Sequence, residues 1–205
     1  MGFALLPKAE AVSPPPDGGY PGGNTAEGQD ALLSLTTGTF NTAVGFFSLR
    51  SDTLGQFNTA VGAGTLLFNV GDPNGFGAIE NTAVGAGALL SNTFGPDNTA
   101  TGAFALLSNT SGGNNTAMGA RALLSNTDGD GNTAVGTYAL RFNTIGFGNT
   151  AVGEGALDFN AEGVFNTAAG SGALSANTVG DENTGLGYAA LLFNTEGDDN
   201  TAISA

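Results

Sequence analysis

A single motif recurs at a fixed spacing along almost the whole chain. The pair Asn-Thr, followed by Ala or once by Gly, begins at eleven places, and nine of the ten intervals between them are 17 residues. The remaining interval, from Asn58 to Asn81, is 23 residues long. Its six extra residues surround the turn-forming segment 71–75, so we expect a loop that leaves the later repeats in register. A fixed period of this kind indicates a stack of identical structural units.

Aligned on this motif, the unit reads N-T-A-V-G-x-x-A-L-L-S-N-T-x-G-x-x, and we number its positions one to seventeen. A helix–turn–helix repeat needs more than about 30 residues, so this unit is too short for one. Two glycines per unit would each destabilise a helix by about 1 kcal/mol. Two short strands, Thr-Ala-Val and Ala-Leu-Leu, fit the length, with one unit forming one coil. The sequence therefore predicts an all-β fold, a parallel β-solenoid or β-roll of about ten 17-residue coils with two strands per coil.

Three segments follow from this pattern. Residues 24–205 are expected to form the solenoid, in which coil 1 begins at Asn24 and coil 10 at Asn183. Residues 12–23 are rich in Pro and Gly and are interpreted as an extended arm. Residues 1–11 end in an A-x-A pattern typical of signal-peptidase sites, so we interpret them as the remnant of a secretory signal. An ordinary loose N-terminus is the alternative for that segment.

Fixed positions become ladders when identical coils stack, because each residue then lies above its equivalent. Position one is Asn in all eleven repeats, and position nine is Leu in all ten full repeats. Asn amides can hydrogen-bond from coil to coil, while Ala at position three and Leu at position nine can fill a narrow interior. We expect structural ladders that include Asn41, Asn58, Asn81, Asn98, Asn115, Asn132, Asn149, Asn166, Leu89, Leu106, Leu123, Leu140 and Leu157.

Position four is apolar in most repeats and is predicted to face outward. Side chains alternate along a strand, so positions three and four cannot both point inward; strands that bend at the turns are the alternative. A contiguous exposed apolar stripe usually marks an interface. Residues 200–205 are expected to form an open strand, which invites end-to-end pairing. The candidates for self-association are Val44, Val61, Val84, Met118, Val135, Val152, Phe142, Phe159, Phe193, Ala202 and Ile203.

Composition argues against several classes of function. The net charge is −14 with only four Lys and Arg, so the clustered cations that bind nucleic acid are missing. No apolar stretch approaches the roughly 20 residues that span a membrane. The chain has no His and no Cys, which removes the usual catalytic triads and thiolate metal sites. Its acidic residues lie in variable turn positions, where a solvated surface explains them better than paired catalytic carboxylates. We expect no enzyme, no cofactor and no metal site.

The motif N-T-A-V-G-x-x-A-L-L-S-N-T-x-G resembles the Asn-Thr-Ala-x-Gly repeats of bacteriophage tail-fibre shafts and of secreted bacterial repeat proteins. It is similar, more distantly, to the head repeats of YadA-like trimeric adhesins. The resemblance covers residues 24–205 and implies an extracellular, fibrous, often trimeric β-roll used for attachment. The unit length differs from that of the adhesins, and no membrane anchor or coiled-coil stalk is recognisable.

Three hypotheses follow for the function. The first is a structural subunit of an extracellular fibre or filament that assembles from copies of itself. The second is a trimeric shaft, like a phage tail fibre or an adhesin, that binds a cell-surface receptor. The third is an ice-binding solenoid, because Thr recurs at positions two and thirteen and would form two hydroxyl ladders.

Overall fold

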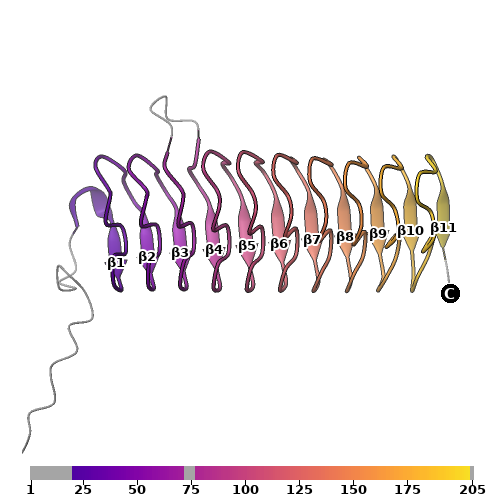
Figure 1. Cartoon of the computed structure of the whole chain (residues 1–205), viewed down its shortest axis with the longest axis horizontal. Coiled ribbons are helices and arrows are strands. Elements are labelled where there is room, and N and C mark those ends of the chain that lie inside the picture. Colours follow the sequence, from indigo (N-terminus) through magenta and orange to yellow (C-terminus); the bar gives the residue numbers. More distant parts are fainter. Residues whose placement is uncertain (1–19, 72–76, 204–205) are drawn as a thin grey trace, which may run out of the picture.

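The computed structural model describes residues 20–71 and 77–203, and within them it confirms the β-solenoid. Eleven three-residue strands lie side by side in chain order in one parallel sheet, forming a rod (Figure 1). A short 3-10 helix, η1 (Pro21–Gly23), precedes them. The strands are β1 (Thr25–Glu27), β2 (Thr42–Val44), β3 (Thr59–Val61), β4 (Thr82–Val84), β5 (Thr99–Thr101), β6 (Thr116–Met118), β7 (Thr133–Val135), β8 (Thr150–Val152), β9 (Thr167–Ala169), β10 (Thr184–Leu186) and β11 (Thr201–Ile203).

The strands keep one register along the rod, with the same repeat positions paired throughout. The longer coil 3 does not disturb it, because Thr59 of β3 pairs with Thr82 of β4 just as Thr42 of β2 pairs with Thr59. The expectation that the insertion preserves the register is therefore confirmed, while residues 72–76 of the loop lie outside the described residues. The expected signal remnant, residues 1–11, and residues 12–19 of the expected arm also lie outside them.

Each strand turns one residue inward and two outward. In most strands, Thr at position two is partly exposed, the residue at position three is buried, and the residue at position four is exposed. This is the alternation that a pleated strand imposes. It confirms that position four faces away from the core rather than being bent into it.

The expectation of two strands per coil is wrong, because the structure has one strand per coil. The Ala-Leu-Leu segment is a turn in which position nine has left-handed backbone torsion, with φ of 51° at Leu123. The segment still bonds to the next coil: the N–H of Leu123 donates to the O of Ala139 at 3.0 Å. Its backbone therefore joins neighbouring coils without being extended, and it bends so that the Leu side chain enters the interior.

The core consists of small and medium-sized side chains that are stacked along the rod axis. Ala at positions three and eight and Leu at position nine are fully buried in the central coils. A left-handed conformation costs a non-glycine residue roughly 1–2 kcal/mol. Burying a Leu side chain contributes about 1.5–3 kcal/mol, so the burial outweighs the backbone strain at position nine.

Candidate functional site

The first Asn column is a buried hydrogen-bond ladder, as the sequence predicted. Asn132 represents it: its N–H donates to Oδ1 of Asn115 at 2.9 Å, and its Oδ1 accepts the N–H of Asn149 at 3.0 Å. Its Nδ2 also donates to the O of Gly146 in the same coil at 2.8 Å. Each Asn thus satisfies backbone groups on two coils, which is a structural role. The predicted ladder residues, both Asn and Leu, are all at most 1% exposed.

A second Asn ladder runs along position twelve and was not among the predicted ladder residues. Asn126 Nδ2 donates to Oδ1 of Asn109 at 2.8 Å and to the O of Gly129 at 3.0 Å. The same pair of bonds recurs along most of the rod, for example at Asn160. The sequence does indicate this ladder, because Asn occupies position twelve in eight of ten coils.

Two turn positions also join the coils. The hydroxyl of Thr110, at position thirteen, donates to the O of Thr127 at 3.1 Å, and most Thr residues of this column do the same. At position sixteen, Asp130 accepts the N–H of Gly113 at 2.6 Å and Asp181 accepts the N–H of Val164 at 2.8 Å. Some of the acidic turn residues therefore accept hydrogen bonds from the neighbouring coil, in addition to facing water.

The outer face of the sheet carries the predicted apolar column. Val44, Val61 and Val84 are each 37% exposed, and Met118 and Val152 are 48% and 43% exposed. Val135 is partly buried at the same position. Successive strands place position four side by side, so these residues form one column that Thr101 of β5 interrupts between Val84 and Met118.

The other self-association candidates lie away from this stripe. Phe142 and Phe159 belong to position eleven, where their rings stack with centroids 5.3 Å apart. Phe193 is 84% exposed in coil 10. Ala202 and Ile203 lie on β11, the outermost strand of the described sheet, where Ile203 is 78% exposed.

The Thr residues at position two share the outer face with the apolar column. Thr116 and Thr133, for example, pair on β6 and β7. Within residues 20–71 and 77–203, no hydrogen bond engages a position-two hydroxyl, in contrast to the position-thirteen hydroxyls. Among the described residues, the position-two ladder is therefore the one of the two expected hydroxyl ladders whose hydroxyls are free along its whole length.

Asp52 interrupts the position-twelve ladder in coil 2. Its side chain is fully buried, and Oδ1 accepts the N–H of Gly55 at 2.8 Å. Oδ2 has no hydrogen-bond partner among the described residues, and the same position in coil 1 is Leu35, which has no donor. Burial raises the pKa of this carboxyl from 3.8 to about 6, against the opposing effect of the Gly55 hydrogen bond. The first two junctions of the rod therefore lack the Asn-to-Asn bond of this ladder, which begins with Asn92 and Asn69.

Replacing Asp52 with Asn is expected to stabilise the protein more at pH 7 than at pH 5. The folded protein holds the Asp52 proton more tightly than the unfolded chain, so this group favours folding by about 1 kcal/mol more at pH 5 than at pH 7. Asn does not titrate, and its amide could donate to the O of Gly55 as Asn92 donates to Gly95 at 2.9 Å. Melting of both proteins at the two pH values, followed by circular dichroism, measures the effect. Equal shifts in melting temperature at both would contradict the raised pKa.

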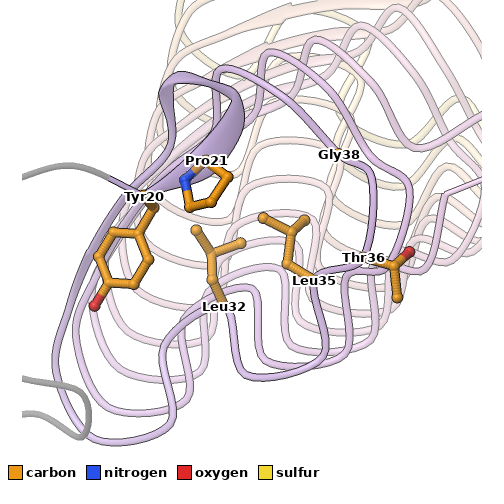
Figure 2. A pocket seen from close by; sticks show the side chains of 6 residues that line it. All are labelled: Tyr20, Pro21, Leu32, Leu35, Thr36 and Gly38. Atoms are coloured by element: carbon orange, nitrogen blue, oxygen red, sulfur yellow. The ribbon is translucent and has the colours of Figure 1, made fainter.

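A cavity of about 170 Å³ lies at the N-terminal end of the rod. Figure 2 shows Tyr20 and Pro21 beside Leu32 and Leu35 around this space, and Thr36 and Gly38 complete its lining. Leu32 is 8% exposed here, whereas position nine of coils 2 to 9 is fully buried. The lining has no carboxylate and no cation, so the cavity is an open end of the core.

Among the residues that the structure describes, no group of three or more His, Cys, Asp or Glu side chains is placed to hold a metal ion. The same part of the chain has no helix of the length and apolar character needed to cross a membrane. No known protein-family model, curated protein or solved structure matches the chain. The sheet face and the side-chain ladders are thus the features from which function is argued.

Proposed function

We propose that this chain is a structural subunit of an extracellular fibre that assembles from copies of itself. The observation that carries the proposal is the apolar column on the outer face of the sheet, at Val44, Val61, Val84, Met118 and Val152, each 37–48% exposed. The column repeats in register along the rod, so a second rod with the same strand spacing can match it along its length. No catalytic role is part of the proposal.

The size of this face supports weak lateral association. Eleven strands spaced ~4.8 Å apart and three residues wide give a face of roughly 48 by 10 Å. Pairing two such faces would bury about 1,000 Å² in total, which is the lower limit for a specific interface. A single contact of this size is concentration-dependent, and a fibre would add such contacts on several sides.

The extracellular location is also a proposal. It is supported by the Ala9-Glu10-Ala11 pattern and by the resemblance of the repeat to those of secreted and tail-fibre proteins. The strongly acidic composition, which keeps isolated rods soluble by mutual repulsion, is compatible with it.

Lysine substitutions on the sheet face test the proposal. The triple variant Val61→Lys, Val84→Lys, Val152→Lys should remain as single rods at concentrations at which the parent forms assemblies, measured by light scattering and negative-stain microscopy. A matched control is Phe94→Lys, Ile145→Lys, Val179→Lys, which adds the same charge at exposed turn residues. If the control loses assembly and the sheet-face variant keeps it, the sheet face is not the contact. A parent that stays monomeric at every concentration would refute the fibre, and a closed trimer would favour the receptor-binding shaft.

A second candidate, an ice-binding surface, is favoured by the free hydroxyls at position two. They form one regular row beside the apolar column of position four, and such an array can order water. A thermal-hysteresis assay of the parent protein tests it, and an absence of activity would exclude it. A variant that replaces Thr116 and Thr133 with Lys should abolish any activity found.

A further inference from the structure

Position seven differs in the middle of the rod from its neighbours. Coils 3, 4, 8 and 9 have Gly there, with φ between 62° and 68°. Coils 5, 6 and 7 have Phe104, Arg121 and Tyr138 in the same left-handed conformation, with φ of 62°, 59° and 62°. This conformation costs a non-glycine residue roughly 1–2 kcal/mol. Coils 1, 2 and 10 also have a non-glycine residue there, with φ of 50° to 59°, so what sets coils 5 to 7 apart is the kind of side chain that they carry.

Two of these side chains, Arg121 and Tyr138, belong to a compact cluster. The guanidinium Nη1 of Arg121 donates to the hydroxyl of Tyr138 at 3.0 Å. Arg141 lies 4.7 Å from the Tyr138 ring centre and 4.3 Å from that of Phe142, which stacks on Phe159. Together they form an aromatic–arginine patch, which consists of Arg121, Tyr138, Arg141, Phe142 and Phe159. Arg and aromatic residues of this kind are enriched at the centres of protein interfaces.

The charges within the patch are not balanced. Asp158 accepts two hydrogen bonds from Arg141, at 2.8 and 2.7 Å, and neutralises it. Arg121 is exposed and forms no ion pair with any residue in 20–71 or 77–203. An unpaired cation, held by a Tyr hydroxyl beside exposed rings, is unusual on a chain with a net charge of −14. The patch is therefore suited to a partner that presents carboxylates.

Such carboxylates are concentrated at the C-terminal end of the same rod. The turns of coils 9 and 10 carry Asp181, Glu182, Glu196, Asp198 and Asp199 within two neighbouring coils. Glu182 and Asp199 are both exposed at position seventeen, where the stack places the two like charges in one column. Neither carboxylate has a hydrogen bond or ion pair among the described residues. Their repulsion is relieved when a cation from outside the chain binds between them.

We propose that the aromatic–arginine patch of one rod binds the acidic turns of coils 9 and 10 of a second copy, with Arg121 between Glu182 and Asp199. This inference rests on the proposed self-assembly and names its partner surface. The two surfaces lie on different coils, so the contact is heterologous and extends a fibre instead of closing a dimer. Salt weakens it, because exposed charges are screened.

Charge exchange tests the contact. Arg121→Glu alone and the double variant Glu182→Arg, Asp199→Arg alone should each need about tenfold or more higher concentration than the parent for half-assembly. An equimolar mixture of the two variants should assemble again, because each supplies the charge that the other has lost. Light scattering at low and high salt gives the concentrations, and circular dichroism checks the fold. If Arg121→Glu does not fold, Arg121→Gln replaces it in the single-variant measurement only, because a neutral side chain cannot restore assembly in the mixture.

Matched controls separate this contact from a general effect of charge. Arg50→Glu changes the net charge by the same amount as Arg121→Glu, and Glu80→Arg, Asp97→Arg reverses two acids at position seventeen of coils 3 and 4. Both controls should assemble as the parent does. Assembly of Arg121→Glu at parental concentrations, or failure of the mixture to recover, would overturn the proposed contact and leave the sheet-face assembly standing. A parent that never assembles would overturn both proposals.

Discussion

Replacing Leu123 with Asp is expected to unfold the rod or to melt it at a much lower temperature. Leu123 is fully buried in the middle of the core, and a buried carboxylate without a partner costs several kcal/mol. Backbone strain would not explain the loss, because Asp tolerates the left-handed conformation at this position at least as well as Leu does. Circular dichroism melting of the parent and the variant measures the effect.

The neighbouring residue provides the control for this experiment. Leu124, at position ten, is partly exposed, so Leu124→Asp should lower the melting temperature much less than Leu123→Asp. If the two variants melt together, position nine does not face the core and the register of the coil is different.

Gly136→Ala is expected to be nearly as damaging, for a different reason. Gly136 has φ of 136°, and a Cβ there would lie 2.6 Å from the O of Gly153 in the next coil. That backbone atom cannot move without displacing the following coil, so the clash adds to a strain of about 1–3 kcal/mol. The melting temperature should fall by many degrees, as followed by circular dichroism.

Gly131→Ala separates this clash from the general effect of replacing a glycine. Gly131 has φ of 64°, and a Cβ at this residue would meet nothing within 4 Å. Other coils have Asp, Glu or Phe at the same position, so the loss should be only about 1 kcal/mol. Similar losses in the two variants would mean that neighbouring coils are not in close backbone contact at position five.

The stacking of the coils and the residues of the core could be predicted, because the same residue types recur at the same positions every 17 residues. Leu123 and Asn132 look like core and ladder residues in a repeat alignment, since their equivalents are constant. The conformation of Ala-Leu-Leu could not be predicted in this way. An apolar run of this composition is typical of a strand, and only the stacked neighbours stabilise a left-handed Leu.

The candidate surfaces were predictable to different degrees. Strand alternation alone places Val84 on the outside. By contrast, Tyr138 and Arg141 look unrelated in the sequence until the turn brings positions seven and ten together. The hydrogen bond that Asp181 accepts from the N–H of Val164 could not be predicted either, because Asp occupies that turn position in only a few coils.

The junctions between coils act in series, because each coil contacts only its neighbours. Under tension along the axis every junction carries the same load, so the weakest one sets the breaking force whatever the length of the rod. We expect the weakest junctions to be the two that flank coil 2, where Leu35 faces Asp52 and Asp52 faces Asn69 instead of one Asn facing another. A rod with more coils would therefore be longer without being stronger. Mechanical failure should begin near the N-terminal end of the rod.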